Sequence, residues 1–278
     1  MTHPHQPGRM YRMPYGFGPS GGPRQGPDGE RFDWMATPLR RAASVSFLTD
    51  GAHLERLLPP GFALVGEPVV TVEIQYYTQL EWLAGRGYNT LGIRFPARFD
   101  GKRDHVQGGF LAVLWENLAD PILSGRDELG FAKLYCDLPP PRQFRGEEHY
   151  FAEWLGHRFI DMSIGGLVEA PKAALPLPGL SGGNDGTLHY KYVPRTGAWG
   201  EADLAYACLT PGTGSHMQVL SAWRGEGRVA FHPTNWEQMP TQFQVVSALA
   251  ALPQLEPRGA SLLETKGGKD LSDQRALG

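Results

Sequence analysis

The sequence contains little cysteine and no long apolar run. Two of its 278 residues are cysteines, Cys136 and Cys208, which excludes a disulfide-rich scaffold and favours a reducing, cytoplasmic location. No stretch of about 18 consecutive apolar residues occurs, so we expect no membrane partner. The N-terminus also lacks the short apolar segment of a secretory signal peptide.

Neither sign of charge is in large excess. There are 26 Lys and Arg residues against 29 Asp and Glu residues, a net charge of -3. We therefore expect no nucleic-acid partner, since such binding depends on a basic surface. A hydrophobic content of 41% excludes global disorder, and 36 Gly with 24 Pro residues favour turns and short strands over long helices.

Several motifs of cofactor-dependent enzymes are absent as well. The sequence has no HExxH, no C-x2-C pair, no P-loop and no G-x-G-x-x-G after a strand, so we expect no metal and no other cofactor. Residues 179–183 (GLSGG) match the nucleophile elbow G-x-S-x-G. The elbow needs a strand before its serine and a helix after it, whereas Ser181 lies in a Pro- and Gly-rich loop. A hydrolase using Ser181 is thus the weakest hypothesis.

The composition divides the chain into three parts. Residues 1–36 form an N-terminal arm rich in Gly and Pro, which we expect to be disordered or pinned to the body or to a neighbouring subunit by Tyr11, Tyr15 and Phe17. Residues 37–265 are expected to form one domain. Residues 266–278 are a polar C-terminal tail, which we expect to be frayed.

Short alternating runs dominate the middle part. Val69–Tyr77 is the clearest strand, with Val72 and Ile74 on one face and Glu73 and Gln75 on the other. A short helix is expected after Asp50, its N-cap, and residues 242–252 fit either a strand or an amphipathic helix. Further expected strands are 43–47, 91–99, 110–115, 131–138, 188–193, 204–209, 218–223 and 228–232. The fold class is therefore mainly β (α+β): a largely antiparallel barrel with a polar lumen and a few short helices.

The stretch Gly125–Lys133 (GRDELGFAK) is the most informative for chemistry. Lys133 stands in an apolar setting, and the alternation places it on one side with Phe131 and Tyr135. Lysine seldom occupies the middle of an apolar strand unless it has a task or a partner. The alternative, an edge-strand or snorkelling lysine, stays open on spacing alone.

The chain resembles the acetoacetate decarboxylase superfamily over roughly residues 37–255, most specifically in a Gly-Arg-acid…Gly-aromatic-x-Lys motif. The matching residues are Arg40, Phe47–Asp50, Leu57–Phe62, Glu67–Pro68, Val72–Ile74, Gly87–Thr90, Gly125–Asp127, Gly130–Lys133 and, more weakly, Ala222–Gly225. The resemblance implies a conical, largely antiparallel β-barrel in a homo-oligomer. It also implies a lysine, here Lys133, that forms a Schiff base with a keto acid.

A lysine attacks a carbonyl only as the neutral amine. With the ordinary lysine pKa of about 10.4, roughly one amine in a few thousand is neutral at pH 7. In the resembled family, desolvation and a second, adjacent lysine favour the neutral form, the device that acetoacetate decarboxylase exemplifies. Here Leu134 stands at the adjacent position, and Thr90 replaces the acid of the Gly-Tyr-x-acid turn. Two groups that tune decarboxylation are thus neutral.

The leading hypothesis is a cofactor-independent lyase of specialised metabolism. It would act on a keto acid other than acetoacetate by decarboxylation or by aldol addition and dehydration. By resemblance, the catalytic residues are Lys133, Glu73 as acid or base, and Arg40 as the partner of a substrate carboxylate. The expected substrate-binding residues are Tyr88, Thr90, Gln75, Tyr135 and Phe131. The alternative is a non-catalytic small-molecule-binding barrel that has lost the decarboxylase chemistry.

Overall fold

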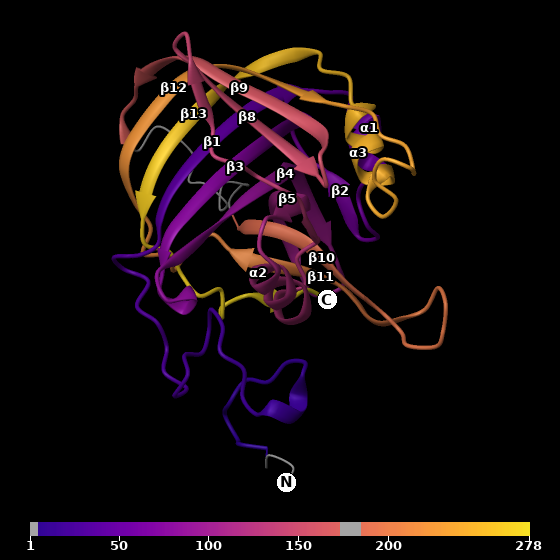
Figure 1. Cartoon of the computed structure of the whole chain (residues 1–278). Helices are drawn as coiled ribbons and strands as arrows, with labels where there is room; N and C mark the ends of the chain where they lie inside the picture. Colours follow the sequence, from indigo (N-terminus) through magenta and orange to yellow (C-terminus); the bar gives the residue numbers. More distant parts are fainter. Residues whose placement is uncertain (1–4, 173–184) are drawn as a thin grey trace.

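One strongly curved sheet of 14 strands forms the body of the computed structural model, which describes residues 5–172 and 185–278 (Figure 1). The strands are β1 Leu39–Leu48, β2 Phe62–Leu64, β3 Val69–Leu80, β4 Arg86–Asp100, β5 His105–Glu116, β6 Lys133–Tyr135, β7 Arg142–Phe144, β8 Glu147–Trp154, β9 His157–Glu169, β10 Gly186–Pro194, β11 Ala202–Pro211, β12 Gln218–Phe231, β13 Glu256–Lys266 and β14 Arg275–Ala276. The helices are α1 Gly51–Glu55, α2 Ala119–Ser124 and α3 Phe243–Ala250, with 3-10 turns η1 Tyr15–Phe17 and η2 Glu81–Leu83 and a π-helical turn η3 Gly125–Leu129.

The strand order is β14-β11-β10-β5-β4-β3-β1-β13-β12-β9-β8-β7, with β2 on β4 and β6 on β5. Most pairs are antiparallel, and β5 pairs in parallel with β6 and β10. The predicted mainly β, largely antiparallel fold is confirmed. Its hydrogen-bonded ladder ends at β14 and at β7, so the barrel-like sheet is not closed by pairing among the described residues.

Strand β3 shows how the sequence builds this sheet. Val70, Val72 and Ile74 are fully buried in the apolar core, as the alternation predicts. Glu73 and Gln75 point the other way and are also buried, at 6% and 5% exposure. A strand covered on both faces, one of them polar, places charged side chains away from bulk water.

Asp50 caps α1 by accepting a hydrogen bond from the Ala52 N–H at 2.9 Å, as expected.

Two strand predictions were wrong in extent. The run 131–138 is a strand only at β6, because Gly130 takes φ +78° after η3 and delays the pairing with β5. The runs 218–223 and 228–232 form one continuous strand, β12. Gly225 and Gly227 lie inside it, where a Cβ would lie 2.4 Å from the Gly165 carbonyl oxygen and 2.6 Å from Val45. These glycines therefore permit close strand packing instead of marking a turn.

The candidate Ser181 lies outside the described residues.

The C-terminal tail is ordered, contrary to the expected fraying. Arg275 and Ala276 pair with β11, and Leu277 is buried at 6% exposure. The Gly278 N–H donates to the Asp104 carboxylate at 2.9 Å. Polar composition misled the prediction, since backbone pairing and one buried leucine suffice to hold this segment.

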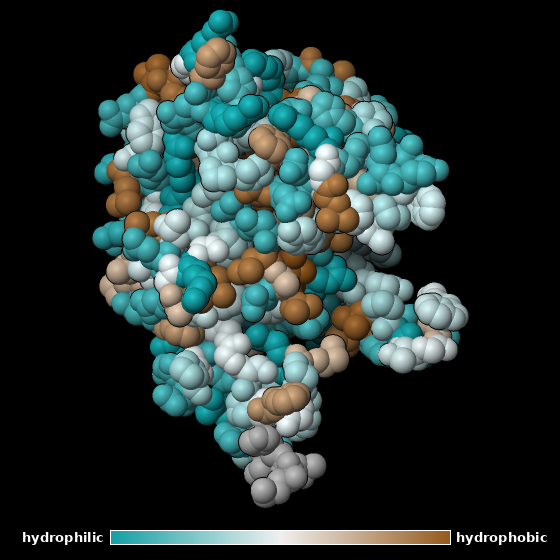
Figure 2. Space-filling view, viewed as in Figure 1, coloured by the Kyte–Doolittle hydropathy of each residue, from teal (hydrophilic) through white to brown (hydrophobic). Residues whose placement is uncertain are grey.

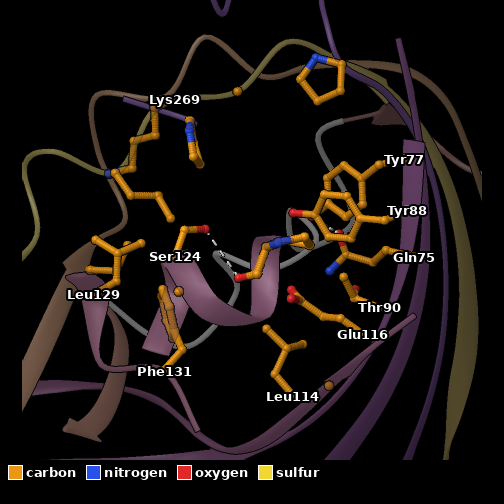
Figure 3. A pocket seen from close by; sticks show the side chains of 18 of the residues that line it. Gln75, Tyr77, Tyr88, Thr90, Leu114, Glu116, Ser124, Leu129, Phe131 and Lys269 are labelled. Atoms are coloured by element: carbon orange, nitrogen blue, oxygen red, sulfur yellow. Dashed lines mark hydrogen bonds between the residues drawn. The ribbon is translucent and has the colours of Figure 1, made fainter. Parts of the chain in front are cut away.

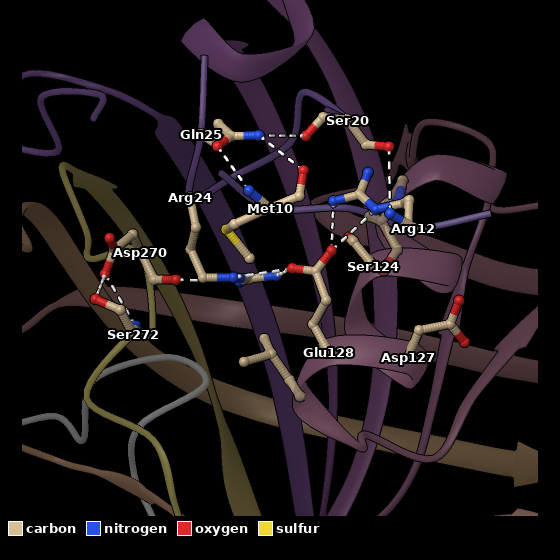
Figure 4. A network of polar contacts seen from close by, with 12 residues as sticks. Met10, Arg12, Ser20, Arg24, Gln25, Ser124, Asp127, Glu128, Asp270 and Ser272 are labelled. Atoms are coloured by element: carbon tan, nitrogen blue, oxygen red, sulfur yellow. Dashed lines mark hydrogen bonds and ion pairs between the residues drawn. The ribbon is translucent and has the colours of Figure 1, made fainter. Parts of the chain in front are cut away.

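The N-terminal arm is pinned to the body by arginines instead of by aromatic residues. Glu128 of η3 receives Arg12 on one carboxylate oxygen and Arg24 on the other, with Nε–O distances of 2.9 and 3.0 Å (Figure 4). Tyr15 and Phe17 are exposed. Figure 2 shows the arm against the lower part of the body, below apolar residues near the middle of this face. Glu128 therefore joins the arm to the segment that leads to Lys133.

Glu128→Gln is expected to release the arm. The side chain of Arg24 is 6% exposed, and breaking a largely buried ion pair costs about 3 kcal/mol. In the variant, the docked arm leaves the buried Arg24 without its carboxylate partner, whereas an arm that detaches exposes Arg24 to water. The population of the detached arm should therefore rise roughly a hundredfold. Limited proteolysis followed by mass spectrometry would measure cleavage within residues 5–30. The exposed Glu55→Gln serves as the control, and equal cleavage rates in both variants would contradict the clamp.

Candidate active site

A cavity of about 190 Å³ lies against the polar face of β3. Strands β1, β3, β4, β5 and β6 supply its walls together with α2 and η3. Both ends of the chain complete it: Arg24 and Trp34 come from the arm, and Lys269 and Asp270 follow β13. The Arg24 guanidinium also donates to the Asp270 carbonyl at 3.2 Å, which joins the two terminal segments. The volume suits a small organic molecule.

Lys133 lies in this cavity at 7% exposure. It opens β6, opposite Leu114 of β5. Its Nζ lies 2.9 Å from Glu116 Oε1 and donates to the Pro121 carbonyl at 2.9 Å. A Cβ on Gly125 would lie 2.4 Å from Nζ, so the absence of a side chain there makes room for the amine. The lysine is thus a buried, partnered group and not a snorkelling surface residue.

Glu116 ends β5 and is 1% exposed. Burial raises the pKa of its carboxyl above the ordinary 4.5, and the charge and hydrogen bond of Lys133 partly offset this. Among the described residues, Glu116 Oε2 has no hydrogen-bond partner. Figure 3 shows its carboxylate in the cavity, on the same wall as Thr90, with which Glu116 pairs across β4 and β5.

A second cluster of polar side chains is centred on Glu73 of β3. Glu73 Oε1 forms an ion pair with Arg94 Nη2 at 3.2 Å and accepts a hydrogen bond from the Gln75 amide. The Tyr77 hydroxyl in turn donates to Gln75 Oε1 at 2.7 Å. Arg94 and Glu73 are both buried, so the pair is strongly held in this geometry.

Two stacked tyrosines form the wall next to Arg40. The rings of Tyr77 and Tyr88 stack at 5.2 Å, and the Arg40 guanidinium lies 4.7 Å from the Tyr77 ring centre. Arg40 and Tyr77 are cross-strand neighbours on β1 and β3. Burial raises the pKa of both tyrosines, so their hydroxyls keep their protons near neutral pH and can donate hydrogen bonds.

The structure brings together seven of the eight expected site residues. They are Lys133, Glu73, Arg40, Tyr88, Thr90, Gln75 and Phe131. Tyr135 does not line the cavity: it is 40% exposed, and its hydroxyl donates to Asp137 at 2.8 Å. The prediction placed it beside Lys133 by alternation, but β6 ends at Tyr135, where the chain leaves the cavity wall.

Sequence reasoning missed Glu116, Arg94, Tyr77 and the residues of both terminal segments. Arg94 lies four residues after Thr90 on β4, so the period of two could have placed it on the same face. Glu116 stood at the polar end of an apolar strand, but its contact with Lys133 depends on the parallel β5–β6 register. No local signal revealed that Trp34 and Lys269 reach the same cavity.

The described residues contain neither a membrane-spanning helix nor a cluster of metal ligands. No helix there is both long enough and apolar enough to cross a membrane. No three His, Cys, Asp or Glu side chains in that part of the chain are grouped so that they could hold a metal ion.

Comparison with known proteins assigns the family. The family described as acetoacetate decarboxylase (ADC) matches residues 12–256, and the chain therefore belongs to it. Membership places the chain among lyase-type enzymes of the acetoacetate decarboxylase-like class, which act on small molecules. A search of curated proteins gives no match.

Solved structures share the fold at low identity. An acetoacetate decarboxylase from Legionella pneumophila is 18% identical with a TM-score of 0.61, covering 91% of this chain and 92% of its own. The enduracididine biosynthesis enzyme MppR, complexed with the condensation product of pyruvate and imidazole 4-carboxaldehyde, is 18% identical with a TM-score of 0.56 (91% and 98%). An acetoacetate decarboxylase-like enzyme from Sphingomonas wittichii RW1 is 16% identical with a TM-score of 0.58 (93% and 99%).

Gly125→Ala is expected to impair the site while sparing the fold. The three atoms nearest to the added methyl group all belong to the flexible end of the Lys133 side chain, so the amine must move. A misplacement of about 1 Å can cost on the order of a hundredfold in rate. Adduct formation at Lys133 with amine-reactive probes should slow while the melting temperature changes little. Gly16→Ala, which has open space around it, is the control. A large loss of stability with normal reactivity would contradict this reading.

His189 should make stability fall in mild acid. The ring stacks on Phe131 at 4.1 Å, and burial lowers the pKa of His189 to about 4. The unfolded chain binds this proton near pH 6.5 and the folded chain only near pH 4, so the free energy of unfolding falls as pH drops through that window. The loss is on the order of 3 kcal/mol.

Urea denaturation of the wild type and of His189→Gln at pH 7.5 and 4.5 would measure this effect. The stability advantage of the wild type should shrink at pH 4.5, because glutamine takes up no proton. An advantage that is the same at both pH values would show that His189 is not held neutral by the fold.

Proposed function

We propose that this protein is a cofactor-independent lyase that forms a Schiff base between Lys133 and a small keto acid. The observation that carries the proposal is a buried lysine amine in a cavity that also contains arginine and carboxylate side chains. A protonated imine withdraws electrons from the neighbouring carbon, so it promotes loss of CO2 or of a proton there. Family membership supports the same class of chemistry.

Arg40 is the proposed partner of the substrate carboxylate. Its guanidinium lines the cavity beside the tyrosine stack, and a bidentate contact would fix the orientation of a keto acid. Tyr88, Thr90 and Gln75 would supply hydrogen bonds to the substrate, and Phe131 an apolar wall. Glu73 remains a candidate acid or base, although its ion pair with Arg94 restrains it.

Decarboxylation and aldol addition with dehydration both fit this site. Thr90 in place of an acid and Leu134 in place of a second lysine favour a substrate other than acetoacetate. The MppR complexes contain pyruvate or a condensation product of pyruvate, which supports an aldol-type reaction as one of the two alternatives. We further propose a cytoplasmic homo-oligomer that acts in specialised metabolism.

A second candidate function is a non-catalytic binding protein. The observation that favours it is the buried ion pair between Lys133 and Glu116, a contact that a purely structural role of the lysine would also explain. A binder of this kind would take up small carboxylates through Arg40 without forming a covalent adduct.

Reductive trapping separates these functions. The protein is incubated with acetoacetate, pyruvate or longer β-keto acids, treated with borohydride, and analysed by intact mass and peptide mapping. We expect a substrate-sized adduct on Lys133 that Lys133→Met abolishes. Lys269→Met is the control, since its amine lies in the same cavity but is held by Pro211, Thr213 and Asp273. Release of CO2 would then distinguish decarboxylation from aldol chemistry.

Absence of an adduct with every keto acid would reject the lyase. If the same compounds still bound, as measured by calorimetry, the non-catalytic binder would take its place.

A further inference from the structure

The carboxylate of Glu116 faces both the amine of Lys133 and the cavity. One oxygen lies 2.9 Å from Lys133 Nζ, and the other has no hydrogen-bond partner among the described residues. The side chain is 1% exposed, so bulk water does not supply a hydrogen bond to that oxygen. Figure 3 shows the carboxylate in the cavity near Thr90 and Leu114. A substrate hydroxyl placed on the carbon that Lys133 attacks would lie within reach of the unpartnered oxygen.

We propose that Glu116 is the proton-transfer group of Schiff-base formation, a role that rests on the proposed function of Lys133. The carboxylate takes a proton from the Lys133 ammonium, which leaves a neutral amine. After the amine has attacked the keto carbon, the Glu116 carboxylic acid returns that proton to the hydroxyl of the carbinolamine.

The proton and electron balance of this step closes without a further reactant. The Lys133 nitrogen forms a bond to the carbonyl carbon, and one amine proton moves to the former carbonyl oxygen. Glu116 then protonates the resulting hydroxyl, the C–O bond breaks, and water leaves. The products are a protonated imine on Lys133, one water molecule and the Glu116 carboxylate, so charge is the same before and after.

Other groups near the amine are less suited to this role. Glu73 is held by Arg94 and Gln75 on the oxygen that faces them. The buried hydroxyls of Tyr77 and Tyr88 keep their protons near neutral pH and cannot act as bases there. Among the described residues, Glu116 is the carboxylate in ion-pair contact with Lys133.

Two opposing influences act on the pKa of Glu116, and burial, which raises it, is the larger. Burial favours the acid and Lys133 favours the carboxylate. The other titratable groups that feel its charge are Tyr88 on β4, Tyr77 on β3 and Cys136 after β6. This arrangement supplies a local base where Leu134 replaces a second lysine: the proton is removed from the amine by a neighbour instead of being repelled by a cation.

Two probes with different proton demands test the proposal in the full-length protein. Adduct formation with 2,4-pentanedione requires dehydration of a carbinolamine, whereas arylation by fluorodinitrobenzene requires only a neutral amine. For Glu116→Gln we expect the pentanedione reaction at Lys133 to slow by about a hundredfold at pH 7. Arylation of Lys133 should slow much less, because it depends on Glu116 only for removal of the amine proton and involves no dehydration step. Peptide mapping by mass spectrometry follows both rates.

Two further variants control the measurement. Glu116→Asp keeps the carboxyl group and should restore part of the pentanedione rate. It also provides the test if the glutamine variant does not fold. Glu148→Gln removes a different buried carboxylate, the partner of Arg41, and should leave the ratio of the two rates unchanged.

The outcomes separate this proposal from the proposed function. If wild-type Lys133 forms an adduct and Glu116→Gln slows neither reaction, or slows both equally, the return of a proton from Glu116 to the carbinolamine is rejected and the Schiff base stands. If wild-type Lys133 forms no adduct with any keto compound, the Schiff-base function itself fails.

Discussion

The site depends on the burial of a lysine amine beside a glutamate. Two charges placed at 7% and 1% exposure are costly to remove from water and are tolerated only when they are close and well hydrogen-bonded. The parallel pairing of β5 with β6 brings them together. The Pro121 carbonyl accepts a further hydrogen bond from the Lys133 amine, and Gly125 has no side chain that would occupy the space of the amine. In a buried pair of this kind, each charged group strongly affects which protonation state of the other is favoured.

The remainder of the fold keeps this pair away from bulk water. Strand β3 is buried on both faces, with an apolar core on one side and Glu73 and Gln75 on the other. The two ends of the chain lie over the cavity and are joined through Arg24. Because Arg24 and Arg12 both bind Glu128 of η3, the arm is attached to the segment that carries Lys133. The arm and the segment that carries Lys133 are therefore mechanically connected.

Much of the architecture followed from local patterns. The alternation in β3 and the Asp50 cap were predicted correctly, since each depends on residues close in sequence. For residues 242–252 the pattern allowed a helix or a strand, and the structure has the helix α3. The errors arose where distant contacts decide. Tyr135 leaves the cavity because β6 is short, β12 continues through two glycines because neighbouring strands approach closely, and the polar tail is ordered because β11 offers it a pairing edge.

By itself, the sequence determined that the chain is mainly β, and its motif around Lys133 pointed to the family and to a lysine nucleophile. Alternation and motif spacing carry that information over a few residues. Only the tertiary structure decided the partners of the site: Glu116 beside the amine, Arg94 on Glu73, and Trp34 and Lys269 from opposite ends of the chain. These contacts depend on strand register and on segments more than a hundred residues apart, and no local pattern encodes the distance between them.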